Sequence, residues 1–187
     1  MAKKIVRKGK KGWVKIVGPK YFRSVEIGES YVYSSNDLIG KKLKINLSVL
    51  SGDMRKQHVN IGFKVVEASG SQAVADIYSY EIVGAHVRRM VRTLKDKVDD
   101  SFFAESKDKI KLRIKPVVIT RAKVNHSVFT AIRKKIREDF IKNCMENDFN
   151  DIVNSVINGE YQGGIRKELN KVYPVSAFEI RKLEVVK

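Results

Sequence analysis

Cysteine, proline and acidic residues are all scarce in this chain of 187 residues. Its single cysteine, Cys144, cannot form an internal disulfide, which excludes a disulfide-stabilised secreted scaffold and a cysteine-based zinc site. Three prolines and twelve glycines exclude collagen-like and proline-rich architectures. No run approaches the roughly 18 consecutive apolar residues of a membrane span, and the start lacks the apolar core of a secretory signal. We therefore expect a soluble, cytoplasmic protein.

Positive charge is abundant by contrast. The 38 Lys and Arg residues outnumber the 21 acidic residues, so the formal net charge is +17 and the pI is near 9.9. This excess predicts a polyanionic partner, which can be nucleic acid, an anionic membrane surface or an acidic protein. The hydrophobic content of 43% is enough for a packed core, so the chain is not a disordered polybasic polymer.

Residues 1–12 differ in composition from the rest of the chain. They contain six cations and no acid, and Gly9 and Gly12 discourage regular structure. This pattern predicts a basic arm that stays disordered until it meets phosphate. The remaining residues, 13–187, have the length of one globular domain.

Most of the first half of the chain alternates between apolar and polar residues. Residues 43–49 and 59–65 have this period of two, so they predict half-buried strands, joined as an antiparallel pair through the turn at 51–53. The same reasoning predicts an edge position or a bulge at Pro116. The other predicted strands lie at 13–17, 25–33, 73–82, 109–119 and 177–186.

Helical periodicity interrupts the strands. Apolar residues recur every three or four positions over 83–98 and 127–145, where Arg and Lys occupy the other faces, and Ser127 is the expected N-cap. Shorter helices are expected at 151–158 and 165–172. The sum is an α+β fold, with an antiparallel β-barrel-like core, flanking amphipathic helices and the basic N-terminal arm.

An enzyme is the alternative that the charge pattern leaves open. A metal-dependent nucleic-acid-processing enzyme needs carboxylates converging on a metal and a nearby lysine, and Asp99, Asp100, Glu105 and Lys107 are of those types. We interpret this stretch instead as a solvated loop that closes a helix. The histidines are scattered, no phosphate-binding loop is present, and Cys144 has no catalytic partner pattern, so we expect no cofactor, metal or catalytic residue.

Phosphate binding without chemistry is the function that we favour. The apolar stripes of the amphipathic helices have the composition needed to cover a sheet, so core packing explains them better than a membrane does. Several separate basic surfaces suit a large folded RNA. Five aromatic residues alternate like core residues and are expected to be buried rather than stacked on bases: Tyr31, Tyr33, Phe63, Tyr78 and Tyr80.

Four ordered segments resemble a known family, the S-three-a-e family of small-subunit ribosomal proteins of archaea and eukaryotes. They are WVKIVGPKYF at 13–22 followed by Ile27-Gly28, LIGK at 38–41 leading into 43–50, the basic block of Leu112-Arg113, 120–123 and 132–136, and Tyr173-Pro174 followed by Arg181-Lys182. The order and spacing of the segments make the resemblance specific. Lys44 and Val49 stand where members of the family commonly have acids. The chain ends directly after its final strand, which is expected of an archaeal-type member.

The resemblance implies a β-barrel core on the platform of the small subunit, near the mRNA exit. The implied role is that of a structural, non-enzymatic constituent of the cytoplasmic ribosome, whose partners are small-subunit rRNA and neighbouring platform proteins, with mRNA as a further candidate and no membrane. Charge clustering and the resemblance together predict the RNA-binding residues, which are Lys3, Lys4, Arg7, Lys8, Lys10, Lys11, Lys41, Lys42, Lys111, Arg113, Arg121, Lys123, Arg133, Lys134, Lys135 and Arg137.

Overall fold

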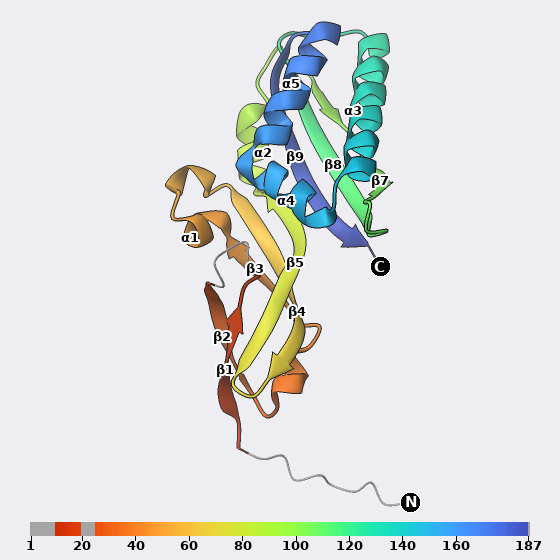
Figure 1. Ribbon diagram of the computed structural model, residues 1–187. Coiled ribbons are helices and arrows are strands. Elements are labelled where there is room, and N and C mark those ends of the chain that lie inside the picture. The colour runs from red at the N-terminus through yellow and green to blue at the C-terminus, as the bar shows by residue number, and fades with distance from the viewer. Residues whose placement is uncertain (1–9, 20–24, 187) are drawn as a thin grey trace, which may run out of the picture. The chain divides into compact units, whose positions relative to one another are not determined.

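The computed structural model describes residues 10–19 and 25–186. They fall into two compact units, and the chain passes from one to the other between Tyr78 and Ser79, inside strand β5 (Figure 1). Most of the arm predicted for residues 1–12 lies outside the described residues. The single domain predicted for 13–187 stays a prediction.

The first unit is built mainly from strands. Its elements are β1 (Gly12–Val17), β2 (Glu26–Val32), the 3-10 helix η2 (Ser35–Leu38), β3 (Lys42–Asn46), α1 (Leu47–Ser51), the 3-10 helix η3 (Met54–Lys56), β4 (Val59–Ser69) and most of β5 (Gln72–Ile82). Strand β1 pairs antiparallel with β2 and parallel with β5. Strand β4 pairs with β3 and with β5, which it meets at a turn where Gly70 has a φ of +56°. Val14, Ile16 and Phe63 are buried in the core of this unit.

Helix α1 replaces the end of a predicted strand. The strand predicted for 43–49 ends at Asn46, and its antiparallel pairing with β4 is as expected. The Asn46 side chain accepts a hydrogen bond from the Ser48 backbone N–H at 2.9 Å, which caps the following helical turn. Gly52, with a φ of +71°, then ends the helix. The prediction was wrong for residues 47–49 because local capping competes with the alternating pattern.

The second unit combines a sheet with helices. It contains the last residues of β5, then α2 (Gly84–Met90), β6 (Lys97–Asp99), β7 (Phe102–Glu105), β8 (Lys111–Thr120), α3 (His126–Glu146), α4 (Phe149–Asn158), α5 (Glu160–Val172) and β9 (Val175–Val186). Figure 1 shows the long helices α3 and α5 running beside each other along β8 and β9. The polar stretch 99–107, predicted as a loop closing a helix, instead contributes to β6 and β7.

Strand β8 is the centre of this sheet. It pairs along its length with β9, and its other edge pairs first with β7 and then with β6. Pro116 stands between those two partners, where its missing N–H costs no ladder hydrogen bond, and its carbonyl accepts from the Asp100 N–H at 3.4 Å. The register with β9 shifts at the same place, so Arg181 lies between the partners of Lys115 and Pro116. Of the two alternatives predicted at Pro116, an edge position or a bulge, the structure shows a register shift whose extra residue lies in the partner strand β9.

Phe140 lies at the middle of the apolar layer between the helices and the sheet. Its side chain is 1% exposed, and its ring packs edge-on against Phe102 of β7 and Tyr161 of α5, with ring centroids 5.9 and 4.9 Å apart. Ile136 and Ile132 of α3, one and two turns before it, are also buried. The spacing of four thus places one apolar stripe of α3 against the sheet, as predicted.

The helix predicted for 83–98 is shorter than expected. It begins near Gly84 as α2 but ends at Met90, and Val98 lies in β6, opposite Val118 of β8. Leu94, expected on the buried helical face, is 70% exposed and has a φ of +70°. The sheet edge offers Val98 a buried position and backbone partners, and this tertiary pairing outweighs the helical period.

Some helix boundaries also differ from the prediction. Helix α3 begins at His126 after an N-cap at Asn125, so Ser127 lies inside its first turn rather than at the cap. Helix α5 begins at Glu160, not after Gly164, because the backbone N–H of Gly163 donates to the carbonyl of Gly159 and continues the helix through both glycines. The α+β class, with a strand-rich core and flanking helices, is confirmed. The path of paired strands in the described residues does not close on itself.

Candidate nucleic-acid interface

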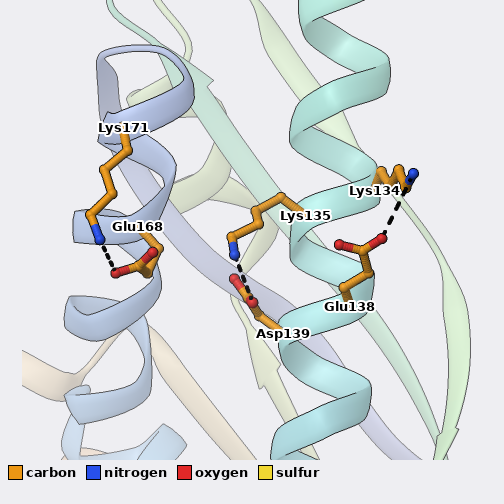
Figure 2. Close-up of polar contacts among 6 residues, drawn as sticks. All are labelled: Lys134, Lys135, Glu138, Asp139, Glu168 and Lys171. Carbon is orange, nitrogen blue, oxygen red and sulfur yellow. Dashed lines mark hydrogen bonds and ion pairs between the residues drawn. The ribbon is translucent and has the colours of Figure 1, made fainter.

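The cations of α3 differ in what they contact. Lys134 lies 3.9 Å from Glu138 and Lys135 lies 3.2 Å from Asp139, both as pairs spaced by four residues (Figure 2). On the neighbouring helix α5, Lys171 is 2.7 Å from Glu168. A phosphate must compete with these carboxylates for the ammonium groups. The predicted contacts of Lys134 and Lys135 with RNA stay predictions.

Arg137 is engaged more firmly than these lysines. Its Nε and Nη2 donate to the two carboxylate oxygens of Asp100 at 2.6 and 2.7 Å, which is a bidentate pair. The Asp100 side chain is only 9% exposed, whereas that of Arg137 is 49% exposed. The hydrogen bond from Arg137 lowers the pKa of Asp100, and the charges of Arg137 and Arg133 contribute to the same shift. Asp100 therefore ties α3 to the connection between β6 and β7.

We expect Asp100→Asn to lower the free energy of unfolding by about 1 kcal/mol at neutral pH, a value discounted because Arg137 is half exposed to solvent. A carboxyl whose pKa is lowered by folding stabilises the protein above its unfolded pKa, and this stabilisation is lost as the pH falls through the folded value. The difference in Tm between wild type and variant should therefore shrink below about pH 4. Thermal unfolding between neutral and acidic pH measures this. Glu138→Gln, which removes an exposed pair, is the control, and a pH-independent difference would contradict the assignment.

The structure brings cations of three elements into one cleft of about 490 Å³, which we call the β8 cleft. Its basic lining consists of Arg113 and Lys115 of β8, Arg133 of α3 and Arg181 of β9. Arg113 also lies over the ring of Phe103, with its guanidinium carbon 5.7 Å from the ring centroid. Of the two acids in the same cleft, Asp100 is paired with Arg137 and Asp99 with Lys97, so the cations outnumber the acids available to them.

Backbone irregularity helps to build the β8 cleft. Arg113 and Lys115 share one face of β8 because side chains alternate along a strand. Arg181 is the extra residue of the β9 bulge, and a bulge redirects the side chain that it carries. Arg113 and Arg133 were predicted as site residues, whereas Lys115 and Arg181 were not. Lys115 could have been predicted, because it follows Arg113 by two residues and so shares its face of the strand. Arg181 could not, because the bulge that places it depends on strand pairing, which only the structure shows.

A second basic hollow, of about 480 Å³, lies at the other end of the sheet and is called here the α2 cleft. Arg89, Arg92 and Lys95 line it, with Ser176 of β9. Ser176 is the extra residue of the second register shift of β9, and its hydroxyl accepts a hydrogen bond from the Lys95 ammonium at 2.8 Å. None of these cations was predicted as a site residue, although their clustering beside a helix was visible in the sequence.

The remaining predicted site residues are distributed over both units. Lys111, Arg121 and Lys123 are exposed on β8 and on the loop that follows it. In the first unit, Lys41 and Lys42 are exposed, and the Lys42 ammonium lies 4.1 Å from the ring centroid of Tyr78. Lys10 and Lys11, which directly precede β1, are exposed. The other arm residues, Lys3, Lys4, Arg7 and Lys8, lie outside the described residues.

Two of the aromatic residues expected in the core are on the surface. Phe63 and Tyr80 are buried as predicted, but Tyr31 and Tyr33 are 51% and 44% exposed. The strand pairing explains the error, because Tyr31 stands opposite Trp13, which is itself 65% exposed, while Val14 of the same strand faces the core.

The carboxylates considered for a metal site do not converge on one point. Asp100 holds Arg137, Asp99 pairs with Lys97, and Glu105 is exposed at the end of β7. No cluster of three or more His, Cys, Asp or Glu residues suited to a metal ion occurs in residues 10–19 and 25–186. In the same ranges, no helix has the length and apolar character required to cross a membrane.

Comparison with known proteins identifies the family. A sequence model described as the Ribosomal S3Ae family matches residues 2–187. The chain belongs to the ribosomal S3Ae family. The resemblance seen in the four sequence segments is thereby confirmed, and it extends over almost the whole chain.

Archaeal relatives of this S3Ae member match most of its length. A protein of Saccharolobus islandicus named small ribosomal subunit protein eS1 is 32% identical over 177 residues, which cover 95% of this chain and 85% of the relative. The eS1 protein of Saccharolobus solfataricus is 30% identical over the same coverage. That of Nanoarchaeum equitans is 28% identical over 92% of this chain and 87% of the relative.

Proposed function

We propose that this S3Ae protein is a structural constituent of the small ribosomal subunit that binds rRNA on the platform, near the mRNA exit. Its partners are small-subunit rRNA and neighbouring platform proteins in the cytoplasm, with mRNA as a further ligand. The proposal assigns it no catalytic residue. The observation that carries it is the family match over residues 2–187, together with relatives that match 95% of the chain and are named as small-subunit proteins.

The charge distribution supports RNA as the partner. The β8 cleft combines three arginines with one lysine, and arginine can fork two phosphate oxygens, which lysine cannot. The α2 cleft adds a separate basic surface at the other end of the same sheet. Basic surfaces on several sides of a protein suit a folded RNA, which surrounds its protein, better than one groove of a duplex.

Footprinting on rRNA tests the proposal. Purified protein is bound to a transcript of its own small-subunit rRNA, and backbone cleavage by hydroxyl radicals is compared with and without protein. We expect protection concentrated in the platform region and the 3′ part of the transcript. Protection spread evenly over the RNA, or equal on a large-subunit transcript, would contradict specific binding to the platform.

A further inference from the structure

Three aromatic side chains form an exposed row on the β1–β2 pair, which we call the aromatic row. Trp13 of β1 and Tyr31 of β2 are direct cross-strand partners, and their ring centroids lie 5.0 Å apart with an interplanar angle of 41°. Tyr33, just after β2, extends the row. The side chains of Trp13, Tyr31 and Tyr33 are 65%, 51% and 44% exposed. Large aromatic residues gathered on a surface mark a binding site more often than isolated ones do.

The strand register keeps the aromatic row exposed to solvent. On β1, Val14 and Ile16 are 6% and 1% exposed, so their face is committed to the core of the first unit. Side chains alternate along a strand, and Trp13 must therefore point away from that core. A shift of one residue would expose both aliphatic residues, so the exposure of the rings is fixed by the fold.

A cation accompanies the rings. The Lys11 ammonium lies 4.9 Å from the ring centroid of Tyr33 and 5.8 Å from that of Tyr31. Lys10 precedes it, and the sequence before them contains Lys3, Lys4, Arg7 and Lys8 without an acid. The nearest lysine on the same strand, Lys15, is already paired with Glu26 at 3.1 Å. Ring faces beside the positive charge of Lys11 complement a base attached to its phosphate.

We propose that Trp13, Tyr31 and Tyr33 stack on unpaired bases of a single-stranded RNA segment while Lys10 and Lys11 contact its phosphates. This inference rests on the proposed function, since it assumes an RNA partner, and it specifies the kind of RNA that this face takes. A duplex keeps its base faces covered, so only single-stranded nucleotides offer the rings a stacking partner. An acidic protein would match the charge, whereas single-stranded RNA matches the charge and also supplies planar bases for the ring faces.

The only tryptophan of the chain, Trp13, reports on this contact directly. The full chain is titrated with a non-complementary single-stranded RNA of about ten nucleotides and with a duplex carrying the same number of phosphates. We expect the single strand to quench the Trp13 fluorescence and the duplex to bind without quenching. Equal quenching by both, or none by either when both bind, would overturn the proposal.

Substitutions separate stacking from charge. Tyr31→Ala should weaken single-strand binding about tenfold and change duplex binding by no more than about twofold, because a lost stacking contact affects only unpaired bases. Tyr31→Phe keeps the ring and should bind like wild type, and an unchanged Tm shows that both variants fold. An equal loss for both RNAs, or no loss for either, would refute the stacking role while leaving RNA binding intact. Failure of the wild type to bind any RNA would instead refute the proposed function.

Discussion

Replacing Phe140 by alanine is expected to lower the free energy of unfolding by about 3–5 kcal/mol, the usual cost of removing a buried aromatic ring from a core. The ring is 1% exposed and touches Phe102 and Tyr161 edge-on, so its loss leaves a cavity shared by α3, β7 and α5. These contacts join the helices to the sheet that carries the β8 cleft. Denaturant titration of both proteins measures the difference.

Phe103→Ala is the matched control for this prediction. Phe103 is of the same residue type on β7, but its side chain is 62% exposed. Its removal should cost less than about 1 kcal/mol, because little apolar surface leaves the core. Equal losses for the two variants would show that Phe140 is not the packing centre between helix and sheet.

Neutralising the β8 cleft is expected to have the largest effect on RNA binding. The triple variant Arg113→Gln, Lys115→Gln and Arg133→Gln removes cations of two elements that the fold brings together. With fewer phosphate contacts, binding of the variant releases fewer counterions. Its affinity for small-subunit rRNA should therefore fall about 100-fold at about 0.1 M salt. The slope of log K against log salt should become shallower by about 2 to 3. Filter binding at several salt concentrations measures both quantities.

A second triple variant holds the charge change constant. Lys134→Gln, Lys135→Gln and Lys171→Gln also remove three positive charges, but each lysine has a carboxylate partner on its own helix (Figure 2). These partners compete with phosphate, so we expect a clearly smaller loss of affinity. If both triple variants lose the same affinity, net charge alone governs binding and the β8 cleft has no special role.

Periodicity predicted the elements whose local pattern and tertiary role agree. Helix α3 and strand β8 were both expected from their apolar spacing, and each buries the predicted face. The helix expected for 83–98 failed because Val98 finds its burial opposite Val118, a residue far along the chain. Val118 lies outside the segment 83–98, so the apolar period of that segment could not reveal the pairing.

The candidate site was predictable only in part for the same reason. Alternation alone placed Arg113 on an exposed basic face of β8. Arg181 joins that face through a register shift, and a shift depends on how two strands pair rather than on either sequence. Tyr31 and Tyr33 looked like core residues because aromatic residues in an alternating strand usually are; pairing with Trp13 decides which face they take.

Sedimentation of a native lysate tests the central claim most directly. After the ribosomal subunits are separated on a gradient, the protein is quantified across the fractions beside small-subunit rRNA, and the run is repeated after RNase treatment. The account predicts that the protein migrates with the small subunit at one copy per rRNA and leaves those fractions when the RNA is digested. Migration as a free protein in the untreated lysate would contradict its role as a structural constituent of the subunit.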